Sequence, residues 1–114
     1  MNIEHIGICV QDPISMGEWY RDNLGFEIVL CAGDDSEGVS FIADGDRKTV
    51  LELGRLPEVP SLDGRKLAPL QLHIAMDCRD PLAEAERLTA AGAEWVGESP
   101  RNSCKGEKIL ISDP

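Results

Sequence analysis

The sequence predicts an α+β protein built from two tandem copies of one unit, in which a strand is followed by a helix and then by further strands. The stretch HIGICVQDP (5–13) matches HIAMDCRDP (73–81), and the two stretches lie 68 positions apart. Further along, GFEIV (25–29) matches GAEWV (92–96) at a spacing of 67 positions. Because the copies share order, spacing and the Asp-Pro pair, we interpret them as an internal duplication.

The first copy reads as a strand, a helix and three more strands. In the expected first strand, 3–10, apolar residues alternate with small residues and one histidine, as in a strand with two different faces. Asp12 suits a helix N-cap and Pro13 the first helical position, so a helix is expected from there to Gly25. The following strands are expected at 27–31, 39–43 and 49–53.

The second copy repeats this order. A strand is expected over 70–76, a helix begins at Asp80 and Pro81 and ends at Gly92, and strands follow at 94–97 and 108–111. Between the copies, prolines and charged residues indicate a linker. The sequence therefore predicts a single domain over 1–114, with module one at 1–54, a linker at 55–69 and module two at 70–114.

Composition and charge narrow the class of protein. The 21 acidic residues outnumber the 11 basic ones, for a net charge of −10, which disfavours a nucleic-acid partner and an anionic membrane surface. No apolar run approaches the roughly 18 residues that span a bilayer, and no secretory signal is evident. We expect a cytoplasmic protein. Its four cysteines are widely spaced without a C-x-x-C motif and are expected to be free thiols.

Three polar residues interrupt apolar strands in phase. His5 and His73 occupy equivalent places in the repeat, and Glu52 lies within the strand sequence TVLELG. Each falls on the face opposite the regular apolar residues of its strand. One such residue alone usually has a structural role, but two imidazoles and a carboxylate on one face would bind a divalent ion such as Zn, Ni, Co, Mn or Fe. We therefore predict His5, Glu52 and His73 as metal ligands.

The duplication also predicts a fourth position. A counterpart of Glu52 at the same spacing falls at position 120, whereas the sequence ends at Pro114. We therefore expect module two to lack its last strand in this chain, together with the fourth residue of the metal site.

The segments EHIGICVQD, WYRDNLGFEIV, TVLEL, LHIAMDCRD and ILISDP resemble those of the vicinal oxygen chelate superfamily. That superfamily includes glyoxalase I, bleomycin-resistance proteins, methylmalonyl-CoA epimerase and extradiol dioxygenases. The resemblance implies two βαβββ modules, whose curved mixed sheets surround a cleft, and a metal held there by His5, Glu52 and His73. It also implies a homodimer that binds a small-molecule substrate.

The resemblance implies a glyoxalase-like lyase or isomerase, in which the metal stabilises an enediolate-type intermediate of a carbonyl or thioester substrate. By the same analogy, Glu52 or the absent fourth residue moves the proton. A metal-free, ligand-sequestering protein of the resistance type is one alternative. An Fe(II) extradiol dioxygenase is the other, although both histidines of the chain are already assigned as ligands.

Overall fold

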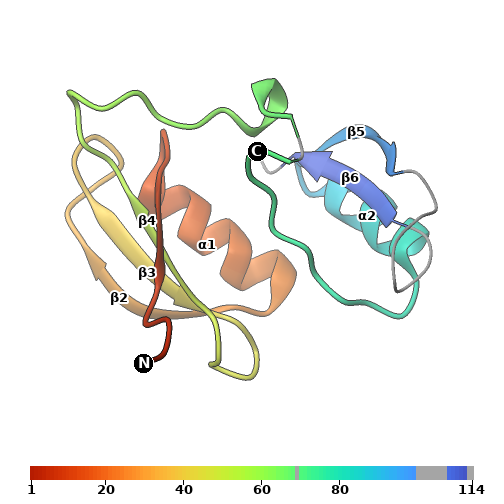
Figure 1. The fold of residues 1–114 in the computed structure, drawn as a ribbon, viewed down its shortest axis with the longest axis horizontal. Helices are drawn as coiled ribbons and strands as arrows, with labels where there is room; N and C mark the ends of the chain where they lie inside the picture. Colours follow the sequence, from red (N-terminus) through yellow and green to blue (C-terminus); the bar gives the residue numbers. More distant parts are fainter. Residues whose placement is uncertain (69, 100–107, 113–114) are drawn as a thin grey trace. The chain divides into compact units, whose positions relative to one another are not determined.

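The protein is known from a computed structural model that describes residues 1–68, 70–99 and 108–112. The chain divides into two units, Met1–Asp63 and Gly64–Pro114, and each unit is described by itself (Figure 1). Within these ranges, no helix has the length and apolar character needed to cross a membrane.

The first unit contains one helix and a mixed four-stranded sheet. The helix α1 spans Pro13–Leu24, and the sheet order is β1-β4-β3-β2. Strands β1 and β4 are parallel, with Gly7 opposite Glu52, while the other neighbours are antiparallel. The strands span Ile6–Cys9 (β1), Glu27–Ala32 (β2), Val39–Ala43 (β3) and Val50–Gly54 (β4).

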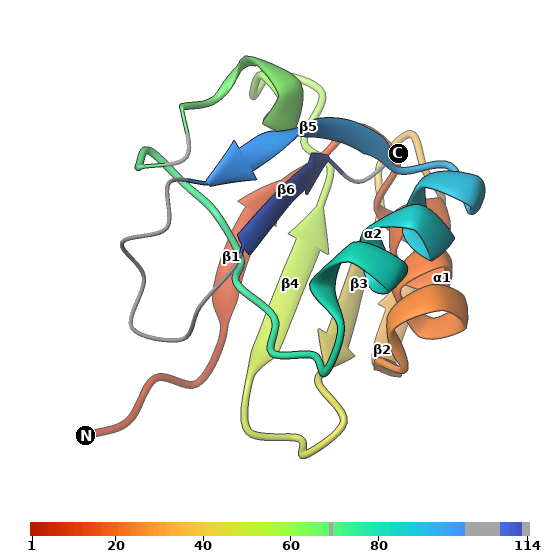
Figure 2. The ribbon, with the colours of Figure 1, turned by 90° about the vertical axis from the view of Figure 1, so that its right-hand side faces the viewer.

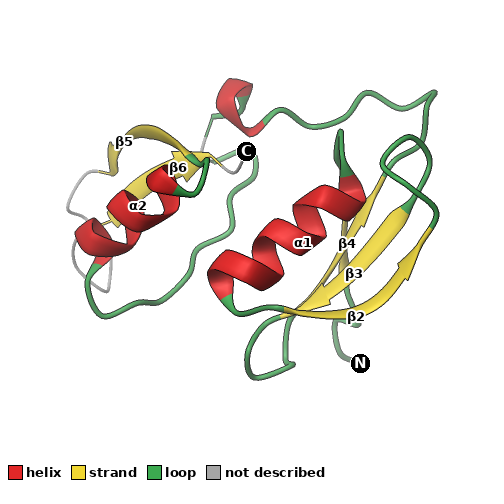
Figure 3. Ribbon diagram, turned by 180° about the vertical axis from the view of Figure 1, so that it is seen from behind, coloured by secondary structure: helices red, strands yellow, loops and turns green. Residues whose placement is uncertain are grey.

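The hydrophobic core of this unit lies between α1 and one face of the sheet (Figures 2 and 3). Alternate residues of the strands are buried there with Tyr20 of the helix, and partly buried Met16 and Trp19 pack against them. Gly17 allows the close approach, because a Cβ atom at this position would lie 2.3 Å from the hydroxyl oxygen of Ser40. The buried strand residues of the core are Val10, Ile42, Leu51 and Leu53.

The two ends of α1 are closed by different residues. Gly25 follows the helix in the left-handed conformation, with φ +70°, as the sequence predicts. Asp12 occupies the N-cap position, but its side chain makes no capping hydrogen bond. Instead, the Asp35 carboxylate accepts hydrogen bonds from the backbone N–H groups of Ile14, at 2.7 Å, and Ser15, at 3.0 Å.

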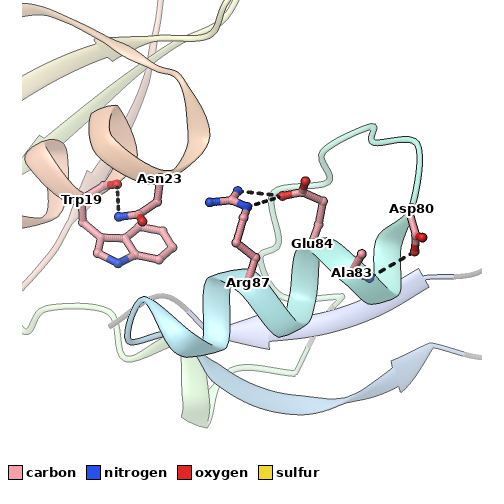
Figure 4. Close-up of polar contacts among 6 residues, drawn as sticks. All are labelled: Trp19, Asn23, Asp80, Ala83, Glu84 and Arg87. Atoms are coloured by element: carbon pink, nitrogen blue, oxygen red, sulfur yellow. Dashed lines mark hydrogen bonds and ion pairs between the residues drawn. The ribbon is translucent and has the colours of Figure 1, made fainter.

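The second unit contains a short 3₁₀ helix η1 at Gly64–Lys66, helix α2 at Pro81–Ala90, and an antiparallel strand pair. Here the predicted N-cap is confirmed, since the Asp80 carboxylate accepts a hydrogen bond from the Ala83 N–H at 3.1 Å (Figure 4). One turn later, Arg87 and Glu84 form an ion pair with a Nη2–Oε2 distance of 2.6 Å. The strands span Glu94–Ser99 (β5) and Lys108–Ser112 (β6).

The structure repeats one irregularity that the sequence pattern does not reveal. The β2–β3 ladder shifts register between Ile28 and Leu30, and the β5–β6 ladder shifts between Trp95 and Gly97. The two bulges lie 67 positions apart, which is the spacing between GFEIV and GAEWV. Since bulges are specific features of a strand pair, their shared position supports the duplication.

The strand predicted over 70–76 is wrong, because residues 71–76 form no strand in the structure. In the first unit, the equivalent strand β1 has β4 as its neighbouring strand and pairs with it in parallel. In the described part of the second unit, the two strands pair only with each other. A segment with alternating apolar residues needs a neighbouring strand to accept and donate its backbone hydrogen bonds. Without such a neighbour, the alternating pattern alone does not produce a strand.

Candidate functional site

The face of the first sheet opposite α1 carries the polar residues that the sequence analysis singled out. Residues of the other phase, including Leu51 and Leu53, are buried against the helix. Glu52 therefore emerges on the open face, between Gly7 of β1 and Phe41 of β3. The predicted separation of the strands into an apolar and a polar face is confirmed for this unit.

His5 and Glu52 are in direct contact on this face. The His5 Nε2 atom lies 3.0 Å from Glu52 Oε2, and the two side chains are 34% and 36% exposed. His5 lies immediately before β1, within the stretch that the sequence predicts as strand. Its ring meets the edge of the Phe41 ring, with centroids 5.4 Å apart and planes at 82°. Gly7 of β1 lies beside the glutamate, since a Cβ atom there would lie 3.4 Å from Glu52 Oε2, at contact distance.

A second carboxylate holds the other ring nitrogen of His5. Glu4 forms a hydrogen bond with Nδ1. This hydrogen bond, followed by the charges of Glu4 and Glu52, raises the pKa of His5 above its ordinary value, while desolvation acts in the opposite direction. When Nδ1 carries a proton donated to Glu4, Nε2 of the neutral ring is left as the atom that can bind a metal.

The donor atoms fit a shared metal ion. Two ligand atoms that each lie about 2.0–2.1 Å from one ion are about 2.9–3.4 Å from one another in tetrahedral or octahedral geometry. The separation of His5 Nε2 and Glu52 Oε2 falls in that range. Histidine nitrogen and carboxylate oxygen are ordinary ligands of first-row divalent metals. The chemistry and spacing of this pair are therefore those of two of the predicted ligands.

The third predicted ligand belongs to the second unit. His73 is exposed and lies between η1 and α2, in the stretch without a strand. Because each unit is described by itself, the assembly of His73 with His5 and Glu52 stays a prediction, as does a fourth ligand at position 120. In neither unit do three His, Cys, Asp or Glu side chains among the described residues form a metal-binding group.

A pocket of about 280 Å³ opens beside Glu52. It is formed where β1 and β4 end, where β3 begins, and where the chain continues beyond β4. Leu62 N–H donates to the carbonyl of Cys9, so part of the segment expected as a linker is hydrogen-bonded to the end of β1. The lining includes Gly7, Cys9, Val39, Glu52, Arg55 and Leu56.

Two residues of this site were not predicted from the sequence. Arg55 lines the pocket three positions after Glu52, and Glu4 precedes His5. The available signal for Arg55 was a cation directly after a strand that carries a glutamate on the face opposite its buried leucines. The side-chain contact between Glu4 and His5 depends on where β1 begins. The alternating pattern predicts a strand from residue 3, whereas β1 begins at Ile6.

With this geometry established, the family follows from comparison with known proteins. The chain matches the family model of the Glyoxalase/Bleomycin resistance protein/Dioxygenase superfamily over residues 2–114. It belongs to this superfamily, as the sequence motifs predict. A search of curated proteins found no significant match.

Solved structures show the same fold. A glyoxalase family protein from Bacillus cereus is 18% identical with a TM-score of 0.69, over 97% of this chain and 85% of its own. TnmS3, an antibiotic binding protein from a Streptomyces species, is 22% identical with a TM-score of 0.66, over 100% of this chain and 90% of its own. The fosfomycin resistance protein FosX from Listeria monocytogenes, solved with Mn(II) and 1S,2S-dihydroxypropylphosphonic acid, is 22% identical with a TM-score of 0.66, over 98% of this chain and 83% of its own.

Proposed function

We propose that this protein is a metal-dependent lyase or isomerase of the glyoxalase type, acting on a small carbonyl or thioester compound. The observation that carries the proposal is the pair of donor atoms on the open face of the first sheet, His5 Nε2 and Glu52 Oε2, 3.0 Å apart beside a pocket. Membership of a superfamily in which FosX was solved with Mn(II) supports a metal in this fold.

In this proposal, His5, Glu52 and His73 hold one divalent ion, which is Zn, Ni, Co, Mn or Fe. The repeat supports the inclusion of His73, since it is the counterpart of His5 in the second copy. The Glu4 carboxylate orients the His5 ring, because it binds Nδ1 and leaves Nε2 directed at Glu52. When bound, the ion supplies Lewis-acid stabilisation of negative charge that develops on substrate oxygens.

Glu52 is the proposed catalytic residue. Its carboxylate lines the pocket and is only partly buried, so a substrate bound there can approach it. A carboxylate in this position accepts a proton from a carbon next to a carbonyl group and returns it to the neighbouring atom, which is general acid–base catalysis. The reacting carbon of the substrate then lies within hydrogen-bond reach of a Glu52 oxygen.

A metal-free binding protein is the second candidate, and one observation favours it. The pocket beside Glu52 also has apolar walls, formed by residues such as Val39 and Leu56. Such walls retain a ligand without any chemistry. TnmS3, a protein of the same fold, is described as an antibiotic binding protein.

We propose in addition that the chain works as a homodimer in the cytoplasm. The support for the homodimer is the family resemblance, and the net charge of −10 disfavours an anionic membrane surface. Sedimentation velocity over a range of concentrations measures the dimer directly, and a single monomeric species at all concentrations contradicts it.

Deuterium exchange separates the two candidate functions. A panel of α-hydroxycarbonyl compounds and acyl thioesters is incubated with the protein in D₂O, and exchange at the α-carbon is followed by NMR. We expect exchange that requires the metal and is lost in Glu52→Gln. The control Glu18→Gln, an exposed residue of α1 on the other side of the sheet, keeps the activity. Ligand binding that survives chelation, without exchange in any compound, supports the binding protein instead.

A further inference from the structure

The pocket beside Glu52 contains a cation whose role the proposed chemistry does not explain. Its walls are mainly apolar or small, and its charged lining residues are Glu52 and Arg55. The volume of about 280 Å³ is close to the lower end of ordinary ligand pockets, about 300 Å³. A small molecule is therefore the ligand that fits, and the guanidinium of Arg55 is the group that would recognise its charge.

The backbone holds Arg55 firmly at the rim of this pocket. Its N–H donates to the carbonyl of Gly38 at 2.9 Å, and the preceding Gly54 carbonyl accepts from Val10 N–H at 2.9 Å. These two hydrogen bonds join the segment after β4 to the chain before β3 and after β1. The position of Arg55 relative to Glu52 is thus fixed by the sheet and does not depend on a free loop.

The side chain of Arg55 has no ionic partner in the part of the chain that the structure describes. Other arginines of the same unit are paired, Arg21 with Asp22 at 2.7 Å and Arg47 with Glu27 at 3.2 Å. The lack of a partner is notable in a chain with 21 acidic residues. The nearby Glu52 carboxylate is occupied by His5.

A partly buried arginine without an ionic partner among the described residues favours an external anion. Its planar set of N–H donors matches the two oxygens of a carboxylate or a phosphonate, and such charge-assisted pairs are strong where water is partly excluded. We propose that Arg55 binds the anionic group of a small acidic ligand, a carboxylate or a phosphonate, in this pocket. This inference rests on the proposed function for its site and names the substrate class of that site.

The arrangement gives the ligand a direction. With its acidic group on Arg55, the remainder of the molecule extends along the apolar walls toward the Glu52 carboxylate. The substrate class is then a small acid whose reacting carbon is separated from the acidic group by a short chain. A neutral ligand of the same shape lacks the contact with Arg55 and binds less tightly.

Matched ligands test this proposal on metal-free protein, so that the outcome does not depend on the metal. Lactate and lactamide have nearly the same shape and differ in charge, and methylphosphonate provides the second anion. Binding is followed by NMR titration of wild type, Arg55→Gln and Arg55→Lys. The control is Arg79→Gln, which removes an exposed arginine of the second unit. Unchanged amide shifts away from the pocket verify that each variant is folded.

We expect Arg55→Gln to weaken at least one of the two anions about tenfold or more, the usual effect of losing a charge-assisted contact. Arg55→Lys keeps part of that affinity, Arg79→Gln keeps all of it, and lactamide binds wild type and Arg55→Gln equally weakly. Equal anion binding by wild type and Arg55→Gln overturns the proposal, and so does the failure of both anions to bind wild type. The metal content of Arg55→Gln is measured in a separate experiment. Loss or absence of the metal there bears on the proposed metalloenzyme and not on anion binding by Arg55.

Discussion

His5 is held by a carboxylate on each side of its ring. Glu4 binds Nδ1, and Glu52 Oε2 lies 3.0 Å from Nε2. In metal sites, a carboxylate on the distal nitrogen fixes the tautomer and orientation of the ligating histidine. The structure brings together two of the three predicted ligands, His5 and Glu52. It also places Glu4 against the His5 ring, a contact that the sequence does not predict.

The Glu4 contact predicts a change in metal affinity. Replacing Glu4 by Ala removes the group that orients His5, and loss of such groups typically costs about 10–100-fold in affinity. We expect Glu4→Gln to retain part of the affinity, because its amide oxygen still accepts from Nδ1. Isothermal titration with Zn²⁺ measures the effect, with Glu18→Ala as a surface control. Wild-type affinity in Glu4→Ala would show that Glu4 does not orient the ring.

Ser40 is the other informative single residue. It is fully buried, and its hydroxyl oxygen has no hydrogen-bond partner in the described structure. A buried unpaired hydroxyl costs about 1–3 kcal/mol of desolvation. We therefore expect Ser40→Ala to raise the free energy of unfolding by about 1 kcal/mol, measured by urea denaturation. A decrease would mean that the hydroxyl contributes to stability.

At the scale of elements, the two helices begin in different ways despite the same Asp-Pro pair. Asp80 caps α2 as the sequence predicts, whereas Asp35, from the segment between β2 and β3, caps α1. The sequence pattern identifies where each helix begins, because Pro and Asp act locally. It does not identify Asp35, because that contact spans 20 or more positions and depends on the path of a loop.

The cap predicts a stability loss that depends on pH. Hydrogen bonds from the Ser15 hydroxyl and then from the Ser15 and Ile14 N–H groups lower the pKa of Asp35. A lowered folded-state pKa stabilises the fold above the ordinary carboxyl pKa of about 3.9, and this contribution is lost as the pH falls through the folded-state value. We expect Asp35→Ala to cost about 1 kcal/mol at pH 7 and less in acid.

Urea denaturation of wild type and Asp35→Ala, at pH 7 and in acid, measures the free energy of unfolding that the cap contributes at each pH. Asp12→Ala is the matched control, since the Asp12 side chain makes no capping hydrogen bond, and it should cost less than Asp35→Ala at pH 7. A larger loss in Asp12→Ala, or a loss in Asp35→Ala that does not change with pH, contradicts the assignment of the cap.

At the scale of the whole molecule, the sequence was sufficient where local patterns decide structure. The helices, strands β2 to β4 and the two faces of the first sheet follow from periodicity and from Asp-Pro and Gly signals. The expectation failed at 71–76, where the same alternation as in β1 forms no strand. A strand is stable only with a neighbour to bond, and β1 has β4 whereas no described strand pairs with 71–76.

The candidate site also has some features that local sequence patterns predict and others that they do not. Phase along the strands was enough to place Glu52 on the open face and to select His5, since both depend on period-two alternation. The pocket and the unpaired Arg55 depend on how three strand ends meet, which no local pattern contains. His73 stays a prediction that rests on the duplication.

The metal content of the protein decides whether His5, Glu52 and His73 form a metal site. The protein is purified without chelator, reconstituted with divalent ions and analysed for bound metal, together with His5→Ala, His73→Ala and the control Glu18→Ala. We expect about one ion per site in wild type and in the control, and loss of the ion in both histidine variants. A wild type that binds no metal after reconstitution, or histidine variants that retain it, would contradict the metal site and favour a metal-free binding protein.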